Sequence, residues 1–269
     1  MLPELANKFQ HFAARHKWMV KAMIKLRNQA NKIIAYSLAE DHLPELNGEK
    51  ALLLRLSPLL KTVFDVGANK GEWSELLLQT VPEIQQVYLF EPGQAAYKTL
   101  QSKFLLNAKC SIENMGLSDV NGKFTFYEGA NAAEHSSFVD TADKSLLATE
   151  GKLTTIDSFV FENNVSHINL LKIDTEGLDF RVILGSKNML GKQQIDFVQF
   201  EYGANWRHAG HTLKAAISLF DSSGYQVFSL QPNGLKKFDP EYYREYYGYS
   251  NFIAVRKSLL DSINSFIIS

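Results

Sequence analysis

The chain has 269 residues, of which 45% are hydrophobic and 21% charged, a composition typical of globular proteins large enough to bury a full core. Its single cysteine, Cys110, excludes an intramolecular disulfide and any zinc or iron–sulfur site built from several cysteines. The formal net charge is −1, but residues 1–39 carry seven basic side chains and one acidic one, a net +6, which leaves 21 basic and 28 acidic residues, a net −7, for the rest. A body with that excess of acid is a poor partner for DNA or RNA, so we predict no nucleic-acid partner.

Residues 1–48 are predicted to form a helical extension with an apolar and a basic face. The mostly apolar face of its helical wheel holds Phe9, Phe12, His16, Met19, Val20, Met23, Leu26, Ala30 and Ile34. The basic face holds Lys17, Lys21, Lys25 and Lys32. Two interpretations of residues 8–34 stay open: packing on the body or a second subunit, and peripheral contact with an anionic membrane. Because the sequence has no run of about 18 apolar residues and no apolar signal segment near its beginning, we expect a cytoplasmic protein, or one peripheral to the inner face of a membrane.

Residues 49–257 alternate strand and helix patterns and are predicted to form one domain, followed by a tail at residues 258–269. Strands are expected at residues 62–66, 87–90, 111–115, 123–127, 168–173, 197–200, 225–230 and 252–255. Helices are expected at residues 72–79, 95–105, 155–162, 178–190 and 212–223. This alternation predicts an α/β fold with a mostly parallel sheet covered by helices on both faces. The last two strands are separated by a polar, tyrosine-rich loop, which predicts an antiparallel hairpin at the C-terminal end of the sheet.

The strongest local signal is a buried strand that runs into a glycine turn and then a helix, Val63-Phe-Asp-Val-Gly-Ala-Asn-Lys-Gly71. Gly67 and Gly71 allow a tight turn and a close approach of the backbone to a ligand, which would lie at the carboxyl ends of the strands. Glu91 comes 26 residues after Asp65, at the end of the second predicted strand. A carboxylate there can accept hydrogen bonds from both ribose hydroxyls of an adenosine-containing cofactor. Without a ligand, the same residues would form a tight strand–helix turn beside an exposed acid.

The turn differs from the dinucleotide fingerprint, which reads G-x-G-x-x-G. Here the pattern is G-x-N-x-G, and Asp65 stands two residues before the first glycine. A pyrophosphate is bound best by neutral donors and a helix N-terminus, and an acid would repel it. An acid suits the cationic amino group of S-adenosylmethionine, so the pattern favours a methyl donor over NAD.

Six different short motifs follow one another within residues 60–256: Asp65-Val-Gly-Ala-Asn-x-Gly71, Phe90-Glu-Pro92, Leu117-Ser-Asp119, Thr154-Thr-Ile-Asp157, Leu171-Lys-Ile-Asp-Thr-Glu-Gly177 and Phe200-Glu-Tyr202. This set resembles the FkbM-type methyltransferases, which are S-adenosylmethionine-dependent enzymes with a Rossmann-like seven-stranded sheet. The resemblance implies a cofactor site whose methionine end is lined by Asp65, Gly67, Asn69 and Gly71, with Ser74 following the turn. It also implies that Glu91 holds the ribose and that Leu117 and Ser118 contact the adenine.

Two acids, Asp174 and Glu176, follow the strand at residues 168–173, beside the place where the methyl group should project. They can position the acceptor, act as a general base, or bind a divalent metal. A purely structural alternative is that Asp174 caps the next helix and Glu176 bonds backbone amides. A metal is not favoured, because no cluster of histidines and cysteines supports it.

Four more residues are candidates for acceptor binding or proton transfer. Glu201 ends the fifth strand of the predicted parallel set, and His208 lies in the following loop, residues 203–211. Trp206 of this loop has a ring suited to stacking on a sugar. His135 belongs to an earlier loop that can approach the cleft from the other side, and it is a candidate base.

We therefore expect an S-adenosylmethionine-dependent O-methyltransferase that acts on a saccharide or another small hydroxylated molecule. The saccharide part depends on the resemblance and on the loop at residues 203–211. An NAD(P)-dependent oxidoreductase would share the ribose-binding acid, but Asp65 argues against it. A non-catalytic module tethered by its basic helix would not need the glycine turn or Glu91.

Overall fold

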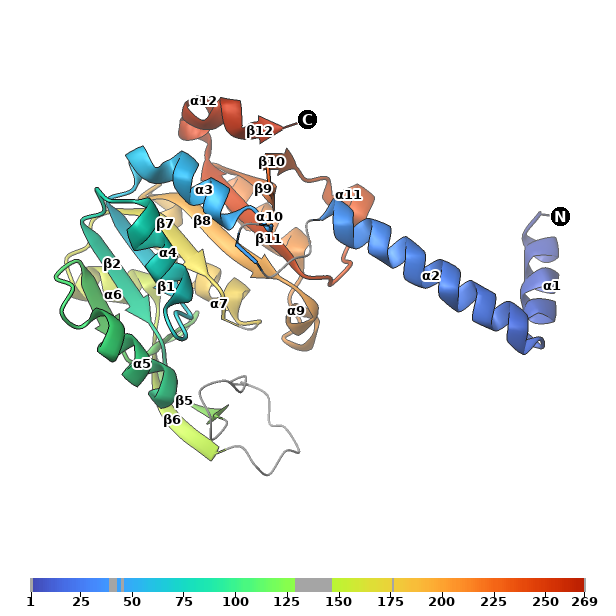
Figure 1. Cartoon of the computed structure of the whole chain (residues 1–269), viewed down its shortest axis with the longest axis horizontal. Coiled ribbons are helices and arrows are strands. Elements are labelled where there is room, and N and C mark those ends of the chain that lie inside the picture. Colours follow the sequence, from blue (N-terminus) through green and yellow to red (C-terminus); the bar gives the residue numbers. More distant parts are fainter. Residues whose placement is uncertain (1, 39–42, 45, 129–146, 176, 269) are drawn as a thin grey trace.

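The computed structural model describes residues 2–38, 43–44, 46–128, 147–175 and 177–268. A large sheet with helices on both faces forms the body, and two N-terminal helices project from it (Figure 1). The strands of this sheet are β1 Thr62–Val66, β2 Gln86–Phe90, β3 Cys110–Glu113, β7 Ile168–Ile173, β8 Ile195–Tyr202, β9 Tyr225–Gln231, β10 Gly234–Lys237, β11 Ser250–Arg256 and β12 Ile267–Ile268. Their order across the sheet is β12-β10-β9-β11-β8-β7-β1-β2-β3.

The predicted α/β fold is confirmed. Strands β3, β2, β1, β7 and β8 pair in parallel, and β11 pairs antiparallel with both β8 and β9. The predicted count of seven strands is wrong, because two short strands extend the sheet beyond β9. One of them, β10, turns back from Gln231 and pairs antiparallel with β9, and β12 then pairs parallel with β10. Residues 258–269, expected as a tail, thus contain a strand of the sheet and also the short helix α12 Leu260–Ile263.

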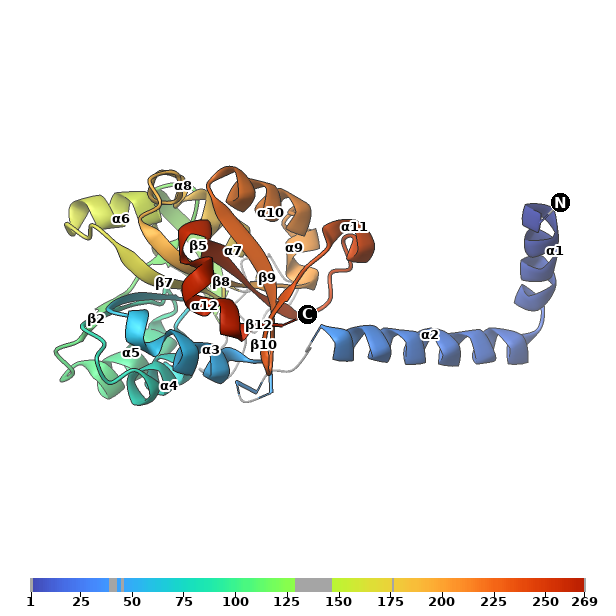
Figure 2. The ribbon, with the colours of Figure 1, turned by 90° about the horizontal axis from the view of Figure 1, so that it is seen from above.

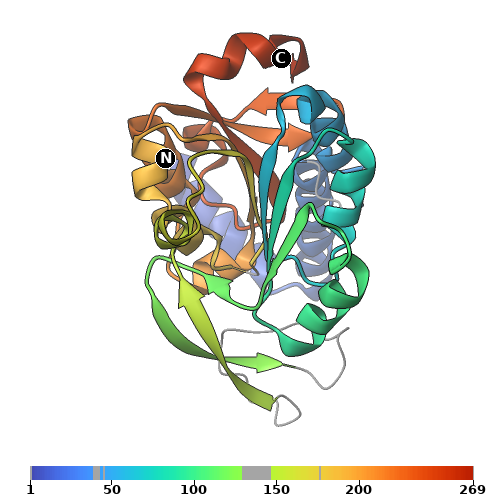
Figure 3. The same cartoon turned by 90° about the vertical axis from the view of Figure 1, so that its left-hand side faces the viewer.

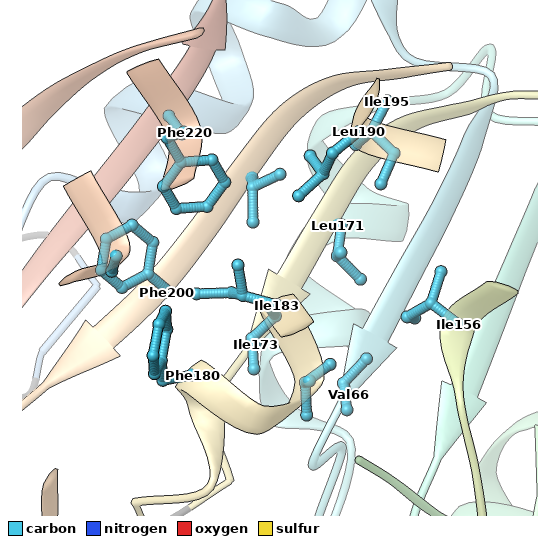
Figure 4. Close-up of a cluster of buried hydrophobic side chains, with 14 of the residues drawn as sticks. Val66, Ile156, Leu171, Ile173, Phe180, Ile183, Leu190, Ile195, Phe200 and Phe220 are labelled. Carbon is cyan, nitrogen blue, oxygen red and sulfur yellow. The ribbon is translucent and has the colours of Figure 1, made fainter. Parts of the chain in front are cut away.

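The helices lie in two layers, each covering one apolar cluster of the sheet (Figure 3). One layer comprises α3 Glu49–Leu56, α4 Glu72–Thr80 and α5 Gln94–Phe104. The other comprises α6 Ile156–Glu162, α7 Asp179–Leu184, α8 Lys187–Gly191 and α10 Leu213–Ser222. Side chains alternate along a strand, so Val63 of β1 joins the first cluster while Phe64 and Val66 join the second. Figure 4 shows the second cluster, in which Phe180 and Ile183 of α7 pack over Ile173 and Phe200.

The helix expected at residues 178–190 is interrupted. Gly185 separates α7 from α8, and a Cβ at this position would lie 2.0 Å from the carbonyl oxygen of Ser118. Only glycine therefore permits this approach of the two segments. The N-terminus of α8 is capped by the carboxylate of Asp157, which accepts hydrogen bonds from Asn188 N at 2.9 Å and Met189 N at 3.0 Å.

A small second sheet crosses one end of the body, at the bottom of Figure 3. It contains β4 Gly116–Leu117, β5 Gly122–Glu128 and β6 Leu147–Thr154, in the order β4-β6-β5. Strand β4 pairs with β6 in parallel, and β5 pairs with β6 antiparallel. The strand predicted at residues 123–127 therefore lies outside the main sheet.

The N-terminal extension consists of α1 Leu2–Ala14 and α2 Lys17–Ser37. Figures 1 and 2 show α2 leading away from the body, with α1 standing across its far end. No residue of α2 is buried, whereas Leu38, Asn47 and Gly48 are already buried in the body. The chain therefore passes from an exposed arm to the packed domain between Ser37 and α3.

Candidate functional site

The glycine turn lies at the carboxyl end of β1 and is folded tightly against two neighbouring strands. Gly67 N and Ala68 N both donate to Phe90 O at 3.0 Å. Gly67 has φ +81°, and a Cβ there would lie 1.9 Å from the carbonyl oxygen of Asp174. This position requires glycine twice over, for its backbone conformation and for the space. The turn places backbone N–H groups at the edge where open α/β sheets bind ligands.

Glu91 follows β2 and is held firmly beside this turn. Its Oε2 accepts a hydrogen bond from Asn69 N at 2.9 Å, and its Oε1 accepts one from Gly93 N at 2.8 Å. Asn69 itself has a positive φ of 47°, a conformation that asparagine tolerates better than most residues. The carboxylate is therefore fixed in orientation by backbone N–H groups of the loops on either side.

A row of polar side chains crosses the buried middle of the sheet next to the turn. Asp65 of β1 pairs in register with Lys172 of β7, which pairs in register with Gln199 of β8. All three are buried. Lys172 Nζ lies 3.4 Å from Asp65 Oδ1, and Ser74 Oγ at the start of α4 donates to Asp65 Oδ2 at 2.7 Å. Asp65 Oδ1 itself accepts no hydrogen bond from a described residue although it is inaccessible to solvent.

Glu49, the first residue of α3, joins this row from the N-terminal side of the chain. Its Oε1 accepts a hydrogen bond from Gln199 Nε2, and its Oε2 accepts one from Asn47 Nδ2 at 3.0 Å. Burial raises the pKa of Glu49, and the nearby Lys172 ammonium lowers it in part. The segment just after the exposed arm thus supplies a carboxylate to the centre of the site.

Lys172 is the positive centre of the cluster. Burial alone would lower its pKa, but the carboxylates of Asp174, Asp65 and Glu49 outweigh burial and raise it, so the side chain is an ammonium ion. Its Nζ donates to Asp174 Oδ2 at 3.2 Å and lies 5.5 Å from the centre of the Trp73 ring. Three carboxylates around one ammonium leave the cluster with an excess of negative charge.

Asp174 is the member of the cluster that reaches solvent, with 40% of its side chain exposed. It ends the β7 segment, and its backbone N–H donates to Val66 O at 2.9 Å, which joins it to the end of β1. One carboxylate oxygen accepts from Lys172, and no described residue donates to the other. The arrangement presents a fixed carboxylate oxygen at the mouth of the site.

Asp179 supports the loop that follows Asp174. Its carboxylate accepts backbone hydrogen bonds from Gly177 N at 3.2 Å and Thr175 N at 3.4 Å. Burial, and next the charge of Asp174, raise the pKa of Asp179 to about 7 against the effect of these bonds. Gly177 has φ +106°, and a Cβ there would lie 2.5 Å from Cβ of Asn205. The loop is therefore packed against the short helix α9 Ala204–His208.

The structure brings most of the predicted cofactor residues together. Asp65, Gly67, Asn69, Gly71, Ser74 and Glu91 all belong to the β1 and β2 ends or to the start of α4. Ser118 is buried, donates its N–H to Thr154 O at 3.0 Å, and bonds Asp119 Oδ1 through its hydroxyl at 3.0 Å. Leu117 is buried in the second apolar cluster, packed among core side chains.

The structure describes only some of the residues predicted to bind the acceptor or transfer a proton. Glu201 is half-buried at the end of β8 and close to Tyr249, whose pKa is raised by burial and then by the Glu201 and Glu49 carboxylates. His208 is exposed at the last residue of α9. Two predicted catalytic residues, Glu176 and His135, lie outside the described residues.

The expectation that Trp206 stacks on a sugar is wrong. Its side chain is only 1% exposed and is surrounded by aromatic rings, with ring centres 5.3 Å from Tyr202, 5.8 Å from Phe180 and 5.9 Å from Phe200. The segment expected as a loop contains a helix, and its apolar side faces the core. Trp206 therefore anchors α9 beneath the site.

Sequence reasoning missed Lys172, Glu49 and Asp179. Lys172 carried a signal, because a charged residue inside an otherwise apolar buried strand requires a partner. Its spacing of two residues from Asp174 gave the first partner, since residues i and i+2 share a strand face. Glu49 carried none, because its bond to Gln199 joins residues 150 positions apart.

These residues fit an adenosine-bearing cofactor with a cationic end. The fixed Glu91 carboxylate suits a ribose, and the unbonded, buried Asp65 Oδ1 belongs to a cluster with surplus negative charge. Among the described residues, no group of three or more His, Cys, Asp or Glu side chains is arranged to hold a metal ion.

The strand order and the acid-bearing glycine turn define an α/β protein of the Rossmann-like methyltransferase class. The family model described as the methyltransferase FkbM domain matches residues 65–227, more than half of the chain. The chain belongs to this family, so the resemblance drawn from the sequence blocks is confirmed. No curated protein sequence matches the chain.

Among solved structures, the chain is similar to the FkbM methyltransferase of Methylobacillus flagellatus KT, at 14% identity and TM-score 0.48, over 72% of this chain and 43% of that one. It therefore spans less than half the length of that protein. It is similar to TrmK of M. capricolum in complex with S-adenosylhomocysteine, at 14% identity and TM-score 0.43, over 77% of this chain and 67% of that one. It is also similar to spermidine synthase of Thermotoga maritima, at 12% identity and TM-score 0.45, over 81% of this chain and 62% of that one.

Proposed function

We propose that this protein is an S-adenosylmethionine-dependent methyltransferase that methylates a hydroxyl oxygen of a saccharide or another small hydroxylated molecule. The observation that carries the proposal is the Asp65–Lys172–Asp174 cluster, which adjoins both the glycine turn and Glu91 at one edge of the sheet. Membership of the FkbM family supports methyl transfer. The choice of a hydroxylated acceptor rests on the family resemblance and on the carboxylates at the mouth of the site.

The cofactor-binding half of the mechanism falls to two segments. Glu91, locked by Asn69 N and Gly93 N, is placed to accept hydrogen bonds from ribose hydroxyls. The turn from Gly67 to Gly71 lets the backbone approach the methionine end closely. When bound, S-adenosylmethionine supplies a methyl group already activated by its positively charged sulfur.

The acceptor half of the mechanism falls to Asp174. A hydroxyl must be aligned with the methyl carbon at about 3–3.5 Å, and its proton must be accepted. The oxygen of Asp174 that is turned away from Lys172 is placed to accept that proton, which typically accelerates such a reaction by about 10²–10⁴-fold. Lys172 is a positioning residue, because it holds the carboxylate through Oδ2 without reaching solvent.

The same cluster disfavours a dinucleotide. The carboxylates of Asp65 and Asp174 outnumber the single buried ammonium of Lys172, so a diphosphate near this edge would meet net negative charge. A cationic sulfur and amino group would meet attraction instead. An NAD(P)-dependent oxidoreductase therefore has no specific observation in its favour.

The test is a comparison of ligand affinities by titration calorimetry on the full chain. We expect S-adenosylhomocysteine to bind and NADH not to bind. Glu91→Gln should weaken S-adenosylhomocysteine binding at least tenfold, because a charge-assisted hydrogen bond to a ribose hydroxyl contributes about 1.5–3 kcal/mol. Glu83→Gln, which changes an exposed acid three residues before β2, is the matched control and should leave the affinity unchanged.

Transfer itself is tested with S-adenosylmethionine carrying a labelled methyl group and a panel of saccharides and hydroxylated metabolites. We expect the labelled methyl group on one hydroxyl of an acceptor, and an acceptor already methylated at that hydroxyl should not be methylated there again. Binding of NADH in place of S-adenosylhomocysteine would overturn the cofactor assignment. Label found only on amines would retain the cofactor assignment and overturn the oxygen assignment.

A further inference from the structure

The helix α2 is long and exposed, and all of its charged side chains are basic. Its 21 residues contain no acid and carry five basic side chains, Lys17, Lys21, Lys25, Arg27 and Lys32. None of these five forms an ion pair with a carboxylate of the residues that the structure describes. Exposed helices in water usually intersperse both signs, because oppositely charged side chains three or four residues apart stabilise the helix. A helix of one sign is suited to a partner of the opposite sign.

The side chains of α2 are sorted around its axis. At about 100° per residue, the four lysines fall within an arc of about 80°. The opposite arc, about 120° wide on the same wheel, is apolar apart from Ser37 at the end of the helix. It contains Met19, Ala22, Met23, Leu26, Ala30, Ile33 and Ile34. Of these, Met23, Leu26, Ile33 and Ile34 are exposed large hydrophobic residues, so no described residue of the chain covers this face.

Two aromatic residues mark the boundary between the faces at either end of the helix. Trp18 and Tyr36 are 18 residues apart, which is about five full turns, so they project on the same side. Their exposed fractions are 71% and 84%. Tryptophan and tyrosine at such a boundary are typical of helices that lie at a lipid headgroup layer, where an apolar ring meets a polar edge.

The helix α1 has an exposed apolar face of its own. Leu5, Phe9 and Phe12 follow the spacing i, i+4 and i+7, which places them on one face of α1, and all three are exposed. Both helices of the arm thus carry large apolar side chains that are exposed to solvent.

We propose that the arm formed by residues 2–37 docks this protein on the surface of an anionic phospholipid bilayer. The apolar face of α2 enters the boundary between headgroups and acyl chains, Trp18 and Tyr36 lie at the headgroup level, and the lysine stems extend to the phosphates. Among the described residues, no helix is long and apolar enough to cross a membrane. The contact is therefore a docking along the surface.

The charge of α2 selects this occupant over a second copy of the chain. Two copies of α2 packed through their apolar faces would bring ten positive charges into one helix pair with no acid on either helix to pair them. The seam would also contain Ala30 between Leu26 and Ile33, where a coiled coil needs larger side chains. An anionic surface satisfies the charged face and the apolar face together.

The test measures partitioning of the full chain onto vesicles by flotation. Vesicles of phosphatidylcholine and phosphatidylglycerol at about 70:30 are compared with vesicles of phosphatidylcholine alone, at about 0.1 M salt. We expect a partition coefficient at least tenfold higher on the anionic vesicles, which falls as the salt is raised. The chain has three tryptophans, and Trp73 and Trp206 are buried, so the fluorescence of Trp18 should shift to shorter wavelength on binding. The variant Trp18→Phe should lose that shift.

Two variants separate the charged and apolar contributions. Lys21→Gln/Lys25→Gln/Lys32→Gln should lower anionic partitioning at least tenfold, and Leu26→Gln/Ile33→Gln should abolish the Trp18 shift. The matched control, Lys98→Gln/Lys187→Gln/Lys237→Gln, removes three exposed lysines of the body and should leave partitioning unchanged. Because α2 buries no residue, both α2 variants should retain the unfolding midpoint of the natural chain.

Three results would overturn the proposal: equal partitioning onto neutral and anionic vesicles, an equal loss in the body-lysine control, and no partitioning at all. The last of these would be accompanied by dimers in light scattering if a second copy is the partner. In that case Leu26→Gln/Ile33→Gln would convert the dimers to monomers.

Discussion

Replacing Lys172 by methionine tests the electrostatic basis of the site. Lys172 Nζ lies 3.2 Å from Asp174 Oδ2 and 3.4 Å from Asp65 Oδ1. At an effective dielectric constant of about 20, each contact contributes about 5 kcal/mol before the cost of desolvating the ions is subtracted. Removing one partner of a buried ion pair typically costs about 3–5 kcal/mol, because the remaining charge stays buried without its partner. We expect Lys172→Met to lower the free energy of unfolding near pH 8 by that amount.

The loss should depend on pH in a definite direction. Burial already raises the pKa of Glu49 in the folded protein, and Lys172 opposes that shift. Without the ammonium, the folded-state pKa of Glu49 rises further above its unfolded value. Between these two pKa values, the folded variant keeps a proton on Glu49 that the unfolded chain releases. The free energy of unfolding of the variant therefore falls as pH rises from the unfolded-state pKa of Glu49 to its folded-state pKa. We expect the variant to lose less stability at about pH 5 than at about pH 8.

The measurement is urea unfolding at both pH values, followed by tryptophan fluorescence. Lys123→Met is the matched control, because Lys123 Nζ lies 2.9 Å from Glu150 Oε2 but the lysine side chain is 73% exposed. Such surface pairs contribute about 0–1 kcal/mol, so this variant should differ little from the natural chain. A loss below about 1 kcal/mol for Lys172→Met, or an equal loss at both pH values, would refute the electrostatic account.

Three further variants test other parts of the site. Asp174→Asn should reduce methyl-transfer turnover about 10²-fold or more while S-adenosylhomocysteine affinity changes less than threefold, measured by labelled transfer and calorimetry, and equal losses would reassign Asp174 to cofactor binding. Gly67→Ala should lower the free energy of unfolding by about 1–3 kcal/mol and abolish cofactor binding, because φ is +81° and the new Cβ would lie 1.9 Å from Asp174 O. Gly122→Ala serves as the control, because a Cβ at Gly122 would meet no atom within 4 Å. The pKa of Asp179 is raised to about 7, so the folded chain retains a proton that the unfolded chain releases above about pH 4. The natural chain should therefore lose thermal stability relative to Asp179→Asn as pH rises from about 4 to about 7. Melting temperatures of the two proteins that change in parallel with pH would contradict the assignment.

Local patterns predicted the parts of the fold that depend on neighbouring residues. The strand Thr62–Val66 and the glycine turn after it are encoded within ten residues, and the helix caps follow the same logic, as at Thr212, whose hydroxyl accepts from Ala215 N. The strand count was wrong because β12 pairs with β10 only after the chain has passed through β11. A two-residue strand has no pattern of its own, so its existence depends on the partner that the fold presents.

The candidate site divides in the same way. That Asp65, Gly67 and Glu91 lie together at one edge of the sheet was predictable, because they form a pattern of spacing along the chain. Trp206 was misassigned because polar neighbours in the sequence suggested a loop, and a helix of five residues is too short to reveal which side faces the core. Lys172 was missed because its strand was recognised by its apolar residues. The one charged side chain in that strand said more about the site than its five neighbours did.

The buried charge of the cluster has a functional reason that stability does not supply. Asp65, Glu49 and Asp174 surround one ammonium, and an apolar row of similar shape would be at least as stable, since buried ion pairs seldom exceed well-packed hydrophobic residues in stability. Lys172 Nζ, 3.4 Å from Asp65 Oδ1, offsets part of the negative charge, but this oxygen accepts no hydrogen bond from a described residue, so a second cation entering from the solvent side would be attracted to the negative charge that remains. Glu49 directly follows the buried Asn47 and Gly48, so the same stretch of backbone fixes both the start of the domain and a carboxylate beside Lys172.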